Sequence, residues 1–204
     1  MASRFDVVSN VRVYDLEESL IASGYPMRTE VEDMGNIPLH SDKDLKRCHK
    51  LSQMATDEHN NGHEQFLSGI LVSFDLTFSN KAWVEAERYR FLTFVSSEST
   101  VHRITQFNIA DQCNEYVDPR IVSILDEYVS QYNAIDDPIK KRLQYLRILY
   151  NVPSGFKLTA RITTNYRCLK NIYRQRKNHV LPEWNKFCAW IETLPYAKEL
   201  LLTD

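Results

Sequence analysis

The sequence predicts a single, helix-rich α+β domain with a small central sheet, and three observations support this prediction. Two segments alternate apolar and polar residues with the period of a half-buried strand, whereas the other periodic segments have helical spacing. With 204 residues, 43% of them hydrophobic, the chain is long enough for one well-buried core and too short to expect two. No repeat and no low-complexity stretch interrupts it, so we expect residues 1–204 to form one domain.

The first half of the chain is predicted to contain two helices and one strand. Ser41 is a suitable N-cap for a helix over Ser41–His59, which we expect to end at Asn60-Asn61-Gly62. The segment Ile70–Phe78 alternates with the period of a strand that buries one face. We expect Asn80 to cap the next helix, which carries Trp83, Glu85, Arg88 and Arg90.

The second half contains the other predicted strand, at Phe156–Thr163, where apolar residues again alternate with polar ones. Proline stands at the start of two of the predicted helices, where its missing N–H costs nothing. The helices of this half are predicted at Pro119–Ala134, at Pro138–Tyr150, at Asn165–Asn178 and in the tryptophan-rich stretch after Pro182.

Charge and cysteine usage narrow the class of protein. The formal net charge of -2 gives no general attraction to nucleic acid or to anionic membranes. The four cysteines are scattered, with no metal-binding spacing, and no stretch approaches the roughly 20 apolar residues of a membrane helix. We therefore expect a soluble, cytoplasmic protein with free thiols, no metal, no membrane and no nucleic-acid partner.

Since the sequence has no glycine-rich phosphate loop, arginine forks and helix N-termini would have to bind any phosphate. The segment Asn165–Arg176 is the strongest candidate, because a helix would place its arginine and asparagine side chains on two stripes beside an apolar one. Amides recognise the edges of heterocycles, and guanidinium groups bind phosphate in a bidentate manner. A solvated basic helix and a nucleic-acid contact are the alternatives for this segment.

Two other segments carry suitable side chains. The stretch Ser96–Arg103 has small and acidic polar residues that suit a ribose or a base, and that equally suit a serine-rich turn capping the next element. Gly62-His63-Glu64-Gln65 precedes the first predicted strand, and its histidine suits either a structural role or acid/base chemistry.

The order and separation of these segments resemble the flavin-dependent thymidylate synthases, which methylate dUMP using methylenetetrahydrofolate, NADPH and FAD. Gly62-His63-Glu64 resembles the family's G-H-E/x stretch, and the distance from it aligns Arg88-Tyr89-Arg90 with the family's R-H-R. Asn165-x-Arg167-x-Leu169-x-Asn171 followed by Arg176 is similar to the family's C-terminal helix motif, and Pro153 stands at the family's distance before it. The similarity covers roughly Leu51 to Trp184.

The resemblance implies roles for particular residues. The residues implied to contact FAD are His63, Arg88, Arg90, Asn165, Arg167 and Asn171. The residues implied to bind dUMP or a related pyrimidine nucleotide are Glu85, Glu98, Ser99, Thr100, Arg103, Arg147 and Arg176. Arg176 and Glu98 are also the implied catalytic residues. Because members of the family are homotetramers whose sites combine several subunits, the resemblance also implies an obligate oligomer.

Several positions depart from the family's pattern. Tyr89 replaces the middle histidine of R-H-R, and Glu85 stands where the family has a glutamine. The S-x-N-E-x-S-x-R element aligns with Ser96–Arg103 only after a two-residue insertion. Leu149 stands where an arginine is expected, and Arg147 replaces that arginine only if the backbone shifts by two positions.

These departures leave alternatives open. An altered-specificity enzyme, such as a pyrimidine nucleotide hydroxymethylase, fits the substitutions at Tyr89, Ser97 and Leu149. A non-catalytic homologue that binds a nucleotide is a second alternative, and a nucleic-acid module on Arg167–His179 is a third. The family's chemistry needs no protein nucleophile, so the absence of a catalytic cysteine motif excludes none of the flavin-based alternatives.

Overall fold

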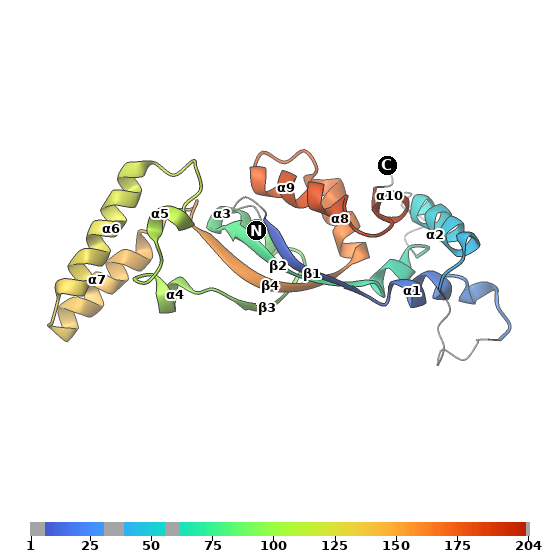
Figure 1. Ribbon diagram of the computed structural model, residues 1–204, viewed down its shortest axis with the longest axis horizontal. Coiled ribbons are helices and arrows are strands. Elements are labelled where there is room, and N and C mark those ends of the chain that lie inside the picture. Colours follow the sequence, from blue (N-terminus) through green and yellow to red (C-terminus); the bar gives the residue numbers. More distant parts are fainter. Residues whose placement is uncertain (1–6, 31–38, 56–61, 203–204) are drawn as a thin grey trace.

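The computed structural model describes residues 7–30, 39–55 and 62–202. Four antiparallel strands form one sheet in the order β1-β2-β4-β3, and α8 and α9 lie over one of its faces (Figure 1). A hairpin of two long helices, α6 and α7, extends beyond one end of the sheet, whereas α1, α2 and α10 lie beyond the other (Figure 1). The predicted α+β class, rich in helix and with a small sheet, is confirmed.

The elements have the following bounds: β1 Val8–Tyr14, α1 Leu16–Ala22, the 3-10 turn η1 Tyr25–Met27, α2 Asp42–Met54, the 3-10 turn η3 Gln65–Ser68, β2 Leu71–Ser79, α3 Asn80–Ala86, β3 Thr93–Ser97, α4 Thr100–Arg103, α5 Ile109–Gln112, α6 Pro119–Ala134, α7 Pro138–Tyr150, β4 Lys157–Asn165, α8 Tyr166–Arg176, α9 Pro182–Ile191 and α10 Ala197–Leu200.

The two strands predicted from sequence, β2 and β4, pair along their whole length at the centre of the sheet. The register runs from Leu71 opposite Asn165 to Ser79 opposite Lys157. Alternate residues such as Phe74 are fully buried beneath α8 and α9, where the Phe74 ring lies 4.6 Å from that of Trp190. The alternation read from the sequence therefore marks the face that the helices cover.

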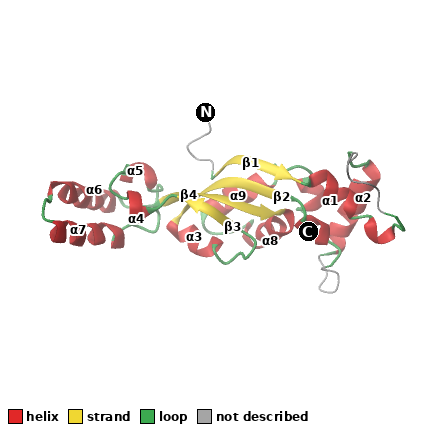
Figure 2. Cartoon of the chain, turned by 90° about the horizontal axis from the view of Figure 1, so that it is seen from below, coloured by secondary structure: helices red, strands yellow, loops and turns green. Residues whose placement is uncertain are grey.

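The opposite face of the sheet carries polar side chains, and no helix of the described residues covers it (Figure 2). Hydroxyl groups on neighbouring strands bond to one another, at 3.0 Å between Ser73 and Thr163 and at 2.8 Å between Thr77 and Thr159. Arg161 forms an ion pair with Asp75 at 3.2 Å. These cross-strand pairs satisfy the polar groups without a covering layer.

The edge strands β1 and β3 were not predicted, and both lack regular alternation. In β1 the register shifts between Ser9 and Arg12, and Asn10 has a φ of 51°, which interrupts the extended backbone. In β3 every residue is exposed, and the register shifts between Phe94 and Ser96. Because each edge strand pairs on one side only, its sequence is less constrained than that of a central strand.

The predicted helix after the first strand was wrong in its cap and its length. Ser79 is the N-cap of α3, since its hydroxyl accepts a hydrogen bond from the Ala82 N–H at 3.3 Å, and the helix ends at Ala86. Arg88 and Arg90 therefore lie in the connection to β3 and not on a helix. Local i,i+3 bonds turn this connection, which lets the chain return to pair with β4.

The other predicted helices agree closely with the structure. Helices α6 and α7 have the predicted bounds, while α2 and α8 begin after their N-caps Ser41 and Asn165. The predicted end of the first helix at residues 56–61 lies outside the described residues. The short helices α1, α4, α5 and α10 were not predicted, since four to seven residues are too few to show a helical period.

Two hydrophobic clusters share Leu158 of β4 at their boundary. The larger cluster lies between the sheet and helices α8 and α9. The smaller one, with Leu125, Ile148 and Phe156 at its centre, holds the α6–α7 hairpin against the end of the sheet. Among the described residues, no helix is long and apolar enough to cross a bilayer.

Candidate active site

Helix α8 is the element on which the predicted site is built. Asn165, the last residue of β4, caps it by accepting the Cys168 N–H at 2.9 Å. Leu169 and Ile172 are fully buried in the larger cluster. The same helix leaves Asn171 and other polar residues on its outer side. One helix thus anchors the core and presents amide and guanidinium groups outward, as the sequence predicted.

The first half of α8 is joined to the segment that precedes the first central strand. Arg167 donates from Nε to Oε1 of Glu64 at 3.2 Å and from a terminal nitrogen to the side-chain oxygen of Gln65 at 2.7 Å. His63, next to Glu64, is exposed. Two of the three segments named by the resemblance therefore meet here.

Lys170 completes this cluster, and sequence reasoning missed it. Its side chain is only 2% exposed, and its Nζ donates to Oε2 of Glu64 at 2.9 Å and to the Ser52 carbonyl at 2.6 Å. A buried ammonium group requires such partners, because its desolvation is costly. The available signal was its spacing: Lys170 follows Tyr166 by four residues, on the buried side of the helix.

The second half of α8 holds Arg176 in a half-buried ion pair with Glu85 of α3. One terminal nitrogen of Arg176 lies 2.7 Å from Oε2 of Glu85, and both side chains are about 15% exposed. The indole N–H of Trp184 donates to the same carboxylate oxygen at 3.2 Å, and the guanidinium carbon lies 4.9 Å from the centre of that ring. Glu85 and Arg176, both predicted to bind the nucleotide, are thus in contact.

His179 lies beside this ion pair. Its Nδ1 accepts the Leu181 N–H at 3.1 Å, and its Nε2 lies 2.8 Å from a terminal nitrogen of Arg176. Nε2 lies 3.2 Å from Oε2 of Glu85. The carboxylate of Glu85 therefore accepts hydrogen bonds from α8 and α9 and lies close to the ring of His179 between them, which fixes these elements against α3.

The segment Arg88-Tyr89-Arg90 reaches α8 through its middle residue. The hydroxyl of Tyr89 accepts a hydrogen bond from Nε of Arg176 at 2.8 Å and donates to Oε1 of Gln175 at 2.9 Å. Arg88 and Arg90 are both exposed, and Arg90 lies over the Phe91 ring at 5.7 Å. The third segment named by the resemblance thus also meets α8.

A second group of predicted residues lies at the other end of the sheet. The backbone N–H and the carboxylate of Glu98 bond to the carbonyl and the N–H of Thr159, at 2.9 and 2.7 Å. Ser99 is the N-cap residue of α4, which begins at Thr100, and Arg103 bonds to Gln106 from its last turn. These residues extend the edge of the sheet toward the α6–α7 hairpin, away from α8 (Figure 1).

Arg147 and Leu149 occupy different sides of α7. Leu149 packs against the smaller cluster, whereas Arg147 is exposed and lies over the Tyr128 ring at 5.3 Å. Tyr145 joins this helix to α4 by donating to the Val101 carbonyl at 2.7 Å. Helix α7 thus stands beside the second group of predicted residues.

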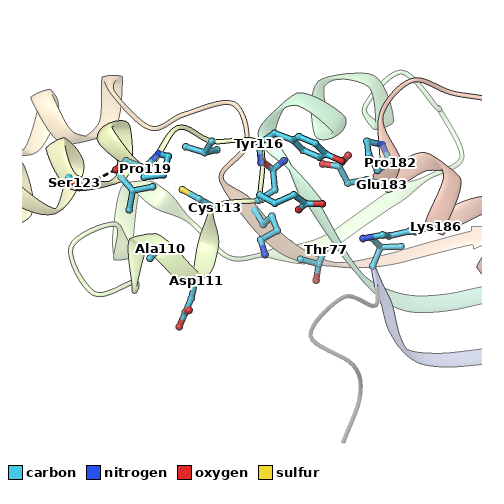
Figure 3. A pocket seen from close by; sticks show the side chains of 16 residues that line it. Thr77, Ala110, Asp111, Cys113, Tyr116, Pro119, Ser123, Pro182, Glu183 and Lys186 are labelled. Carbon is cyan, nitrogen blue, oxygen red and sulfur yellow. Dashed lines mark hydrogen bonds between the residues drawn. The ribbon is translucent and has the colours of Figure 1, made fainter.

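A groove of the described chain lies elsewhere. It has a volume of about 660 Å³ and lies between the α5–α6 connection, the ends of β2 and β4 and the start of α9 (Figure 3). Thr77, Cys113, Lys157 and Lys186 are among its lining residues, and none of the predicted site residues is. The predicted residues of the described chain are therefore not gathered in this groove.

None of the four cysteines is an activated nucleophile. Burial raises the pKa of Cys48, Cys113 and Cys168, and burial together with the charge of Glu192 raises that of Cys188 to about 11. The thiols therefore stay protonated near neutral pH. No group of three potential metal ligands occurs within residues 7–30, 39–55 and 62–202.

Comparison with protein-family models gives no match, and comparison with curated proteins gives none either. Comparison with solved structures does. A flavin-dependent thymidylate synthase from Helicobacter pylori, complexed with FAD and dUMP, has a TM-score of 0.67 at 16% identity, over 94% of this chain and 98% of the other. A second such structure from the same bacterium, with FAD and dUMP, has a TM-score of 0.67 at 17% identity, over 95% and 97%.

The chain has the fold of the flavin-dependent thymidylate synthases. The match covers nearly all of both chains. The fold implied by the sequence resemblance is thereby confirmed. In this version of the thymidylate synthase fold, Glu64 and Glu85 each pair with an arginine of α8.

The buried lysine gives a direct test of this arrangement. Lys170→Met removes the charge but keeps an unbranched side chain, so Glu64 and the Ser52 carbonyl lose a buried donor. We expect the free energy of unfolding, measured by urea denaturation, to fall by about 3 kcal/mol. Lys46→Met, the same change at an exposed position on α2, should alter it by less than about 0.5 kcal/mol. Equal effects of the two changes would contradict an anchoring role for Lys170.

Proposed function

We propose that this chain binds FAD and methylates dUMP to dTMP, with methylenetetrahydrofolate and NADPH as co-substrates. One observation carries the proposal: the segments His63–Gln65, Arg88–Arg90 and Asn165–Arg176, which carry the sequence resemblance, meet around α8 in a chain with this fold. They are joined by hydrogen bonds between residues up to 106 positions apart, so their meeting is a property of the folded chain.

The side chains around α8 fit FAD by their chemistry. Guanidinium groups such as those of Arg167 and the exposed Arg88 and Arg90 suit the two phosphates, and the amide of Asn171 suits the edge of a heterocycle. FAD, when bound, supplies the electron transfer that the side chains themselves cannot perform. The protein's own contribution is to bind and orient, which agrees with the absence of an activated thiol.

The nucleotide is assigned to Arg176 and Glu85 together with the group at the other end of the sheet, which consists of Glu98, Ser99, Thr100, Arg103 and Arg147. Arg176 is the residue best prepared to bind an anionic or carbonyl group, because its guanidinium is already oriented by Glu85 and Tyr89. Glu98 and Arg103 lie next to α4, where the polar groups Ser99 and Thr100 begin a helix.

These two groups lie apart in one chain, which supports an assembly in which subunits share each site. Glu98 is held at the edge strand β3, whereas Arg176 lies between α3 and α9 on the covered side of the sheet. A nucleotide that contacts both groups therefore has to lie between two copies. We propose a homotetramer with FAD bound between subunits.

Light scattering tests the assembly. At micromolar concentration we expect a mass four times that of the chain, because separated groups on one chain need partner chains to complete each site. A control at high salt distinguishes a specific assembly from weak electrostatic association, because salt screens the charges and would dissociate the latter. A monomer under both conditions would contradict the shared site.

An absorbance spectrum followed by anaerobic NADPH oxidation tests the activity. The purified protein is expected to be yellow, to oxidise NADPH faster with dUMP than without it, and to release tritium from C5-labelled dUMP when methylenetetrahydrofolate is added. A colourless protein that binds uridine nucleotides would instead identify a non-catalytic binder. A protein that has no flavin colour and binds no uridine nucleotide would contradict the proposed function.

Arg176 is the residue whose loss should harm nucleotide binding most. Arg176→Ala is expected to weaken dUMP binding by about 2–4 kcal/mol, because a charge-assisted pair is lost. Arg176→Lys should recover little, since an ammonium group cannot replace the planar fork. The matched control is Arg174→Ala, an exposed arginine on the same helix. Calorimetric titration measures the dUMP affinity of each variant, and thermal unfolding checks that each variant is folded. Equal affinities of the two alanine variants would show that Arg176 has a structural role only.

A second candidate function is favoured by the side chains that face Arg176. Glu85 stands where the family has a glutamine, and Tyr89 stands where it has a histidine, and both contact the guanidinium. An altered-specificity pyrimidine nucleotide hydroxymethylase would use these differences. Mass spectrometry of the product distinguishes the two functions, because hydroxymethyl transfer adds one more oxygen atom than methyl transfer.

A further inference from the structure

A chain of hydrogen bonds connects Arg176 to Asn171 along the outer side of α8. Arg176 donates from Nε to the hydroxyl of Tyr89 at 2.8 Å, and that hydroxyl donates to Oε1 of Gln175 at 2.9 Å. The amide nitrogen of Gln175 in turn donates to Oδ1 of Asn171 at 3.1 Å. Every donor in this chain meets an acceptor, so the four side chains have one mutually consistent arrangement.

Tyr89 is the only member of the chain that does not lie on α8. It follows α3, and its ring contacts both the guanidinium of Arg176, at 5.6 Å, and the ring of Trp184, at 5.9 Å. Its hydroxyl accepts from Arg176 and donates to Gln175, which joins these two side chains. A phenylalanine would keep the ring contacts and lose this link.

The chain of hydrogen bonds determines which side-chain atoms remain available to bind a ligand. In Arg176, Nε bonds to Tyr89 and one terminal nitrogen bonds to Glu85, and the described residues provide no acceptor for the other terminal nitrogen. In Asn171, which is exposed, Oδ1 is occupied by Gln175, which leaves the amide N–H groups as the donors offered outward. Both ends of the chain thus present donors whose orientation depends on the links between them.

We propose that Tyr89 is a positioning residue that couples the nucleotide-binding Arg176 to the flavin-binding Asn171, so that occupation of one end strengthens binding at the other. This inference rests on the proposed function, which places dUMP at Arg176 and FAD at Asn171. The coupling is reciprocal: a ligand that holds one end of the chain removes the disorder that the other ligand would have to remove. It uses a tyrosine that departs from the resembling family's pattern.

Two variants interrupt the chain of hydrogen bonds at different points. Tyr89→Phe frees both Arg176 and Gln175, so dUMP binding is expected to weaken about tenfold even without FAD. Gln175→Met leaves the Tyr89–Arg176 bond in place and cuts only the link to Asn171. For this variant we expect unchanged dUMP affinity without FAD, but loss of the tightening that FAD causes in the unmodified protein.

The measurement is a set of dUMP titrations of the full chain, with and without saturating FAD, and of FAD titrations with and without dUMP. We expect each ligand to tighten the other at least fivefold in the unmodified protein, and by less than twofold in either variant. Tyr173→Phe is the matched control, because Tyr173 lies on the same helix as Gln175. Its hydroxyl donates to Glu192 at 2.8 Å and takes no part in the chain of hydrogen bonds. Its coupling should equal that of the unmodified protein.

The outcomes separate the two proposals. If the unmodified protein binds both ligands and Tyr89→Phe and Gln175→Met keep the full coupling, the positioning role of Tyr89 is overturned while the proposed function stands. If the unmodified protein binds neither FAD nor dUMP, both proposals fail. Equal loss of coupling in Tyr173→Phe would also overturn the inference, because any lost hydroxyl on the helix would then have the same effect.

Discussion

The position of α8 depends on Asn165, which ends the central strand β4 and caps the helix that follows it. Asn165 pairs with Leu71 in the sheet, so the register of β4 determines where the helix begins. A helix turns about 100° per residue. A shift of one residue would therefore rotate Leu169 away from the core and Arg176 away from Glu85. Every contact of the candidate site thus follows from strand pairing through a junction that has no intervening loop.

Two carboxylates hold the arginines of this helix in fixed orientations. Glu64 meets Arg167 and Lys170, and Glu85 meets Arg176 and, at 4.0 Å, Lys81. Since each carboxylate faces two cations, each cluster keeps an excess of positive charge after its internal pairing. The arginines are then held in place without being neutralised, which is what recognition of an anionic ligand requires.

The fold places the predicted site residues in two groups within one chain. One group surrounds α8 over the sheet, and the other lies at β3, α4 and α7, toward the helical hairpin (Figure 1). The groove of about 660 Å³ serves neither group. Assembly is thus the physical step that joins the two halves in the proposed function, and the Tyr89 hydroxyl links the parts that a single chain already brings together.

The sequence by itself determined the central strands, the long helices and the polar face of α8, because the period of apolar residues and the N-caps Ser41 and Asn165 are local properties. It also predicted, through a resemblance, that Arg167, Asn171 and Arg176 belong to a binding site. Only the tertiary structure decided that Lys170 is buried against Glu64 and that Arg176 is shared between Glu85 and Tyr89. These pairs join residues 87 to 106 positions apart, and local patterns contain no information on which distant carboxylate or hydroxyl will meet a given cation. The edge strands were likewise decided by the folding of the whole chain, since β1 pairs with β2 and β3 pairs with β4. The turn that carries Arg88 and Arg90 leads into β3 and depends on the same pairing.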